Sequence, residues 1–94
     1  MCSHAEGQTT IASGDESHSE GDSTIASGNY SHAEGDATVA SGISSHTEGS
    51  YTKATGNNQH VQGKYNIEDT NNRYAHIVGN GSSNTARSNA HTIA

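Results

Sequence analysis

Apolar and polar residues alternate along the first two thirds of the chain in blocks of five residues. One block reads SHAEG at residues 3–7, and another reads TIASG at residues 10–14. Within each block the side chains alternate in character with a period of two, which is typical of a β-strand. Threonine, alanine and glycine share one face of TIASG, and serine, alanine and glycine share one face of SHAEG. We therefore predict strands with one face of small residues and one face of larger residues.

Both blocks recur every fourteen residues. The first block returns as SHSEG at 17–21, SHAEG at 31–35, SHTEG at 45–49 and QHVQG at 59–63, and the second as TIASG at 24–28, TVASG at 38–42 and TKATG at 52–56. Two residues of turn type, such as Asp15 and Glu16, follow each block. One coil of strand, turn, strand and turn thus takes fourteen residues. We predict an all-β fold, a parallel β-roll whose coils stack at about 4.8 Å.

Glycine ends every block, so that glycines fall at successive multiples of seven. We assign these residues to the turns, because glycine accepts a positive φ that other residues adopt with difficulty. The nine turn glycines are Gly7, Gly14, Gly21, Gly28, Gly35, Gly42, Gly49, Gly56 and Gly63.

The larger face of the TIASG blocks places Ile11, Ile25 and Val39 in one ladder. The opposite faces carry only small residues and approach closely, so we expect a thin roll with this apolar ladder on its outside. A contiguous apolar strip on a surface usually marks an interface. Closed symmetry around an axis buries such a strip between copies of one chain. The ladder therefore predicts an obligate homo-oligomer.

The repeat decays toward the C-terminus, where Lys53 replaces the isoleucine of the ladder and Val61 replaces an alanine. Solenoids need atypical terminal repeats that end the stack. We predict that the β-roll covers residues 1–63, with 50–63 as its last coil. Residues 64–94 are predicted to form a short β-rich C-terminal cap or connector. Its expected strands are 73–78 and 86–93, joined through a loop at 79–81, and its polar run 68–72 is expected to be a loop.

Composition narrows the class of protein. The 94 residues are 28% hydrophobic and include no Leu, Phe, Trp or Pro, so a monomeric globule of this size would lack a sufficient core. A net charge of −6 with few apolar residues is typical of disorder, but a disordered chain needs no strict spacing. No Lys or Arg precedes residue 53, which argues against nucleic-acid binding. Cys2 is the one cysteine, which excludes an internal disulfide, and no apolar stretch reaches membrane-span length, so we expect no membrane insertion.

The alternating S-x-A-x-G and T-x-A-x-G blocks of residues 3–63 resemble the YadA-like head repeats of trimeric autotransporter adhesins. Similar SHAEG and TIASG repeats occur in tail-fibre and neck-appendage-like proteins of phages and prophages of Gram-positive bacteria. The segments at 63–66, 73–81 and 86–93 resemble this second group. The resemblance implies a left-handed parallel β-roll and three chains about a shared axis. In that trimer Ile11, Ile25 and Val39 are expected to form the interface.

For function, the resemblance implies a structural fibre segment of a phage or prophage tail or appendage, which displays host-surface recognition sites. The alternative is the head domain of a bacterial trimeric surface adhesin that binds host cells or matrix. The expected partners are further copies of this chain and a host cell-surface receptor or glycan. The expected location is the virion tail or appendage, or the bacterial cell surface. No cofactor is implied.

Histidine and glutamate form two further predicted ladders on one face of the roll. The histidines are His4, His18, His32, His46 and His60, and the glutamates, two residues along, are Glu6, Glu20, Glu34 and Glu48. Imidazole nitrogen and carboxylate oxygen on one side of a strand are metal ligands, so a metal-binding ladder is a reading from another functional class. Metal sites are normally singular, whereas this pattern recurs in every coil. We therefore favour a structural role and assign no metal.

The repeat also bears on catalysis, ice binding and receptor binding. A Ser/His/Glu set exists in each coil, but catalysis needs one preorganised cleft, so we predict no enzyme. Thr10, Thr24, Thr38 and Thr52 form a threonine ladder, which we expect to face inward rather than toward ice. Tyr30, Ile43 and Tyr51 interrupt the acidic turns. A tyrosine there is either a stacking platform for a ligand or a lid over an interface edge.

Overall fold

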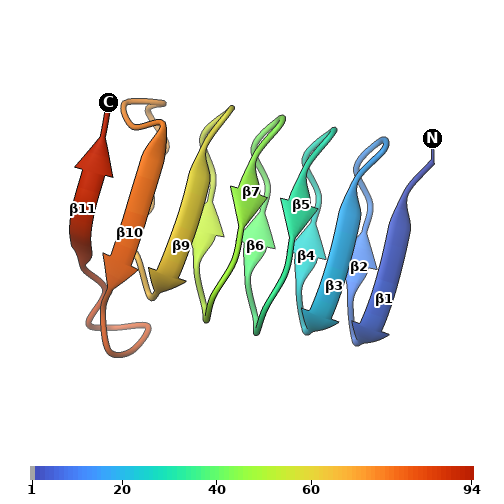
Figure 1. The fold of residues 1–94 in the computed structure, drawn as a ribbon, viewed down its shortest axis with the longest axis horizontal. Coiled ribbons are helices and arrows are strands. Elements are labelled where there is room, and N and C mark those ends of the chain that lie inside the picture. Colours follow the sequence, from blue (N-terminus) through green and yellow to red (C-terminus); the bar gives the residue numbers. More distant parts are fainter. Residues whose placement is uncertain (1) are drawn as a thin grey trace.

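A computed structural model describes residues 2–94 as a parallel β-solenoid of about six turns (Figure 1). The described residues form strands and turns without a helix, and they contain no helix that is long and apolar enough to cross a membrane. The strands are β1 (His4–Gln8), β2 (Ile11–Ala12), β3 (His18–Asp22), β4 (Ile25–Ala26), β5 (His32–Ala33), β6 (Val39–Ala40), β7 (His46–Thr47), β8 (Lys53–Ala54), β9 (His60–Lys64), β10 (His76–Asn80) and β11 (Asn89–Ile93).

The strands make two sheets, one on each side of the roll. One sheet has the order β1-β3-β5-β7-β9-β10-β11 and the other the order β2-β4-β6-β8. Neighbouring coils pair in parallel at a shift of fourteen residues, so that His4 lies opposite His18 and Ile11 lies opposite Ile25. The molecule measures 34 × 24 × 15 Å. The predicted all-β parallel fold of fourteen-residue coils is therefore confirmed.

Small side chains fill the narrow space between the sheets. Ala26, Ala33 and Ala40 are fully buried and pack as one cluster. Thr24 is also buried, and its hydroxyl donates to the carbonyl of Glu20 at 3.0 Å. Ser17 donates from its hydroxyl to the carbonyl of Gly14 at 2.8 Å. Serine and threonine therefore satisfy the turn carbonyls in an interior that larger residues would not fit.

Three of the four residues of the threonine ladder lie inside the roll, as expected, whereas Thr10 in the first coil is only partly buried. Thr24, Thr38 and Thr52 have no exposed surface, and each hydroxyl donates to a main-chain carbonyl four residues before it. These three buried threonines present no flat face to the surroundings.

The structure corrects the reason given for the nine turn glycines, because only five of them have a positive φ. Gly21 has a φ of 110° and ends a histidine block. Gly28 ends a TIASG block with φ outside the positive range, but a Cβ there would lie 2.1 Å from the carbonyl oxygen of Gly42 in the next coil. Residues that are not glycine take the positive φ two residues later, as at Glu16 and Tyr30. Close approach of backbones, rather than φ, requires glycine at Gly28.

The coils continue beyond residue 63, where the sequence predicted a cap or connector. β10 pairs in parallel with β9, and His76 lies opposite His60 at a shift of sixteen residues. β10 also includes Gly79 and Asn80, which were predicted to be a loop, whereas residues 73–75 lie outside it. The H-x-x-G pattern of β9 recurs in β10, but the two extra residues between them hide it from a fourteen-residue search. β11 then pairs antiparallel with β10.

The buried carboxylate of Asp69, whose side chain is 1% exposed, holds the loop between β9 and β10 through hydrogen bonds. One carboxylate oxygen accepts hydrogen bonds from the main-chain N–H groups of Arg73 and Tyr74 at 2.7 and 2.8 Å. The same oxygen accepts from the buried side chain of Gln59 at 2.8 Å. Gln59 in turn accepts from the N–H of Gly56 at 3.0 Å. A single carboxylate thus ties the inserted loop to the coil beneath it.

Candidate functional site

The apolar ladder lies on the outer face of the four-stranded sheet. Strand pairing places Ile11, Ile25 and Val39 side by side in successive coils. Ile11 is 49% exposed, and the side chains of Ile25 and Val39 are half-buried. The alanines that follow Ile25 and Val39 are fully buried. The three side chains predicted to form a trimer interface are therefore contiguous on the surface of a single chain. The interface itself stays a prediction.

Beyond Val39 the next position of the ladder carries a charged side chain instead of an apolar one. Lys53 takes the next position, and its ammonium lies 3.8 Å from the carboxylate of Glu68. The side chain of Asn66 accepts from the N–H of Lys53 at 2.8 Å and donates to its carbonyl at 3.1 Å, as a neighbouring strand would. Ile67 follows, fourteen residues after Lys53, and is 51% exposed. The fourteen-residue spacing from Lys53 points to Ile67 as a further ladder position. The predicted ladder omits Ile67 because no TIASG block surrounds it.

The predicted histidine ladder forms on the opposite sheet as a stack of imidazole rings. Ring centroids of successive histidines from His4 to His60 lie 4.7–4.8 Å apart. The stack extends to His76, whose ring centroid lies 5.1 Å from that of His60. His76 lies outside the histidine ladder predicted from the sequence, because its shift from His60 is sixteen residues rather than fourteen. The rings follow the spacing of the strands that carry them.

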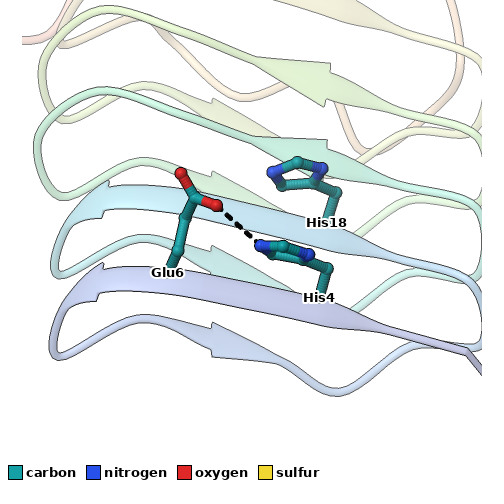
Figure 2. Close-up of side chains that lie close together, drawn as sticks. All are labelled: His4, Glu6 and His18. Atoms are coloured by element: carbon teal, nitrogen blue, oxygen red, sulfur yellow. Dashed lines mark hydrogen bonds and ion pairs between the residues drawn. The ribbon is translucent and has the colours of Figure 1, made fainter.

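Glutamates pair with the histidines, but not in the same way in every coil. His4 and His18 are hydrogen-bonded through Nε2 to the glutamate of their own strand, Glu6 at 2.6 Å and Glu20 at 3.0 Å. Figure 2 shows the first of these pairs, with the ring of His18 above that of His4.

Farther along the stack the pairing shifts to the preceding coil. His46 is hydrogen-bonded through Nε2 to Glu34 at 2.9 Å, and His60 is bonded to Glu48 at 3.3 Å. The predicted histidines and glutamates are thus brought together, and the pairing direction changes between His18 and His46.

His32 lies where the pairing direction changes. Its Nε2 atom is buried and has no hydrogen-bond partner among residues 2–94. Burial lowers the pKa of His32 below its ordinary value, and the neighbouring rings of His46 and His18 lower it further. The carboxylates of Glu34 and Glu20 act in the opposite direction without offsetting this. The Nε2 atom of His76 is also buried and unpartnered among residues 2–94. Among the five histidines of the fourteen-residue repeat, His32 is the one without a glutamate partner, although its block has the same sequence as that of His4.

Serine and histidine of one block lie on opposite faces of the strand. The hydroxyl of Ser31 is buried and donates to the carbonyl of Gly28 at 2.6 Å, whereas His32 faces outward. The Ser/His/Glu combination that can be written down from each block is therefore not assembled within a coil.

The turn residues divide between exposed and packed positions. Tyr30 is 59% exposed and Ile43 is 47% exposed. Tyr51 instead stacks on Tyr65, with ring centroids 4.8 Å apart, and the guanidinium of Arg87 donates to its carbonyl at 2.9 Å. Tyr51 is therefore packed against a neighbouring ring, whereas the exposed ring of Tyr30 is free to contact a ligand.

A scan of protein-family models, a search of curated proteins and a search of solved structures each found no match to this chain. The family resemblance of the repeats therefore stays a prediction, and the function is argued from the surfaces described above.

Proposed function

We propose that this chain is a structural segment of a homotrimeric fibre of a phage or prophage tail or appendage. Three copies pack about a common axis through the apolar ladder of Ile11, Ile25 and Val39. In this proposal each chain is a left-handed roll, and the segment that contains β11 caps its C-terminal end.

The observation that carries the proposal is the contrast between the interior and the ladder. The buried hydrophobic residues of the coils are mostly alanines, with Val61 and Ile77 toward the C-terminal end. A core of alanine and hydroxyl side chains buries little apolar area per coil, so a chain of this size gains stability from association. The largest apolar side chains of the first three coils instead lie outside. Burying each of them fully stabilises by roughly 1.5–3 kcal/mol.

Recognition of a host receptor or glycan fits the turns that carry Tyr30 and Ile43. The N–H of Ser44 donates to the carbonyl of Asn29 at 2.8 Å, so these two turns are neighbours in the stack. Both side chains are exposed at turns, outside the strands that carry the ladder. An exposed aromatic ring beside an aliphatic side chain suits stacking on a sugar or a receptor side chain. A rigid fibre would present this pair in a fixed orientation.

Replacement of one ladder residue tests the proposed association. Ile25→Asp places a carboxylate in the proposed interface between chains. We expect the oligomer to dissociate and its chains to unfold in the same step. Ile43→Asp is the matched control, because Ile43 is exposed on a turn outside the ladder. Sedimentation gives the mass and circular dichroism the fold of each variant. A folded, soluble Ile25→Asp monomer, or equal dissociation by both variants, would contradict the proposal.

A further inference from the structure

We propose that the histidine–glutamate face holds one divalent transition-metal ion, bound by His32 Nε2 together with the carboxylate of Glu34 and the imidazole of His46. The site lies within a single chain, so it does not depend on the proposed trimer.

The reason for a singular site is an imbalance between donors and acceptors along the stack. Six stacked imidazoles face four glutamates, since Gln62 takes the place of a fifth carboxylate. Glu20 is engaged by His18 and Glu34 by His46, which leaves no carboxylate for His32 between them. The Nε2 atoms of His32 and His76 are both buried and unpartnered among residues 2–94, but of these two only His32 belongs to a group of metal-ligating side chains. A buried imidazole nitrogen without a partner is costly, and an ion would satisfy it.

The distances suit chelation after a small adjustment. Ligand atoms of His32, Glu34 and His46 all lie within 4.8 Å of one another. Glu34 and His46 are already 2.9 Å apart, which is close to the separation of two ligands on one ion. Zinc binds nitrogen at about 2.0–2.1 Å, so two nitrogens on one ion lie about 3.4 Å apart. The His32 and His46 rings, 4.7 Å apart, must converge by roughly 1 Å, and the half-exposed His46 ring has room to tilt.

Ligand chemistry selects the class of ion. Imidazole nitrogen with one carboxylate suits Zn²⁺, Ni²⁺, Co²⁺ or Cu²⁺, whereas Mg²⁺ and Ca²⁺ prefer sites built from oxygen alone.

Recurrence of the pattern does not make every coil a site. Neighbouring ligand groups share a histidine, as the groups around Glu20 and Glu34 share His32. An ion on His32, Glu34 and His46 therefore prevents the adjacent groups from filling. The group of His4, Glu6 and His18 remains, but its first two side chains are each 60% exposed, so we expect weaker binding there.

Calorimetric titration of the full chain with Zn²⁺ tests the site. We expect saturable binding, and the dissociation constant of the tightest-bound ion should rise at least about tenfold in His32→Gln. Mg²⁺ should not compete with Zn²⁺. The control is His91→Gln, because His91 is exposed on β11 outside the ring stack. Cu²⁺ bound to the wild-type chain should show electron-spin coupling to two imidazole nitrogens.

Circular dichroism checks that each variant is folded. If His32→Gln does not fold, Glu34→Gln replaces it under the same criterion. Absence of saturable Zn²⁺ binding, or an equal loss of affinity in the His91→Gln control, would overturn the metal site.

Discussion

At the scale of single residues, the backbone of one coil lies so close to the next that one methyl group decides whether the coils stack. A Cβ at Gly28 would lie 2.1 Å from the carbonyl oxygen of Gly42. The obstacle is backbone in a paired coil, which cannot move aside as a flexible side chain would. The same reasoning does not apply to the exposed Ser27 immediately before it.

We therefore expect Gly28→Ala to destabilise the fold by about 3 kcal/mol or more, because the strain exceeds ordinary overpacking of a core. Ser27→Ala should change the free energy of unfolding by less than about 0.5 kcal/mol. Chemical denaturation of both variants makes the comparison. Equal stability of Gly28→Ala and the wild-type chain would show that the coils are less closely stacked than described.

His32 makes the stability depend on pH. Its pKa in the folded chain is lower than the 6.5 of a free histidine, so the unfolded chain takes up its proton first as the pH falls. Stability is therefore full above the unfolded value and decreases as the pH falls toward the folded value. We expect a lower melting temperature at about pH 5 than at about pH 7.5, measured without added metal.

His32→Gln should reduce that pH dependence, whereas His91→Gln should leave it unchanged. Melting curves of the three proteins at both pH values provide the test. An unchanged melting temperature of the wild-type chain across this range would contradict the described environment of His32.

At the scale of elements, the sixteen-residue coil depends on the loop that Asp69 fastens. Burial alone would raise the pKa of this carboxyl group, but hydrogen bonds from the N–H of Tyr74, the guanidinium of Arg73 and the N–H groups of Asn71 and Arg73 lower it. The carboxylate form therefore contributes stability above the unfolded pKa of 3.8, and this contribution is lost as the pH falls through the folded value.

Asp69→Ala should destabilise the chain by about 3–5 kcal/mol, because it removes the shared acceptor of the N–H groups of Arg73 and Tyr74 and of the buried side chain of Gln59. Glu68→Ala is the control, since it removes an exposed carboxylate paired with Lys53 at 3.8 Å, and should cost less than about 1 kcal/mol. Hydrogen exchange would locate the loss around β9 and β10. Similar costs for the two variants would show that Asp69 does not hold the loop.

The sequence was sufficient for the elements that obey its period and insufficient for those that depart from it. Identical spacing predicts that His4 and His18 share a register, because parallel coils of equal length align equivalent residues. A strand at 73–78 was predicted, but its parallel pairing with β9 as a further coil was not, because two inserted residues move His76 to a shift of sixteen. The lack of a hydrogen-bond partner at His32 Nε2 could not be predicted either, because the blocks that carry the histidines are nearly identical in sequence. Whether a glutamate pairs with the histidine of its own coil or of the next coil depends on how the neighbouring pairs are arranged.

At the scale of the whole molecule, two unlike surfaces lie on opposite sides of a thin roll. One sheet carries the apolar ladder and the other carries stacked imidazoles with acidic partners. An alanine and hydroxyl interior between them provides little hydrophobic stabilisation to a lone chain. The proposed trimer buries the first surface at its axis and leaves the second facing outward, where the proposed metal site remains accessible.

The native mass of the unmodified chain, measured by light scattering on a sizing column, tests this account most directly. The account predicts about 29 kDa, three times the 9.7 kDa of one chain. A folded species of 9.7 kDa would mean that Ile11, Ile25 and Val39 remain exposed to water, and it would contradict the trimeric fibre.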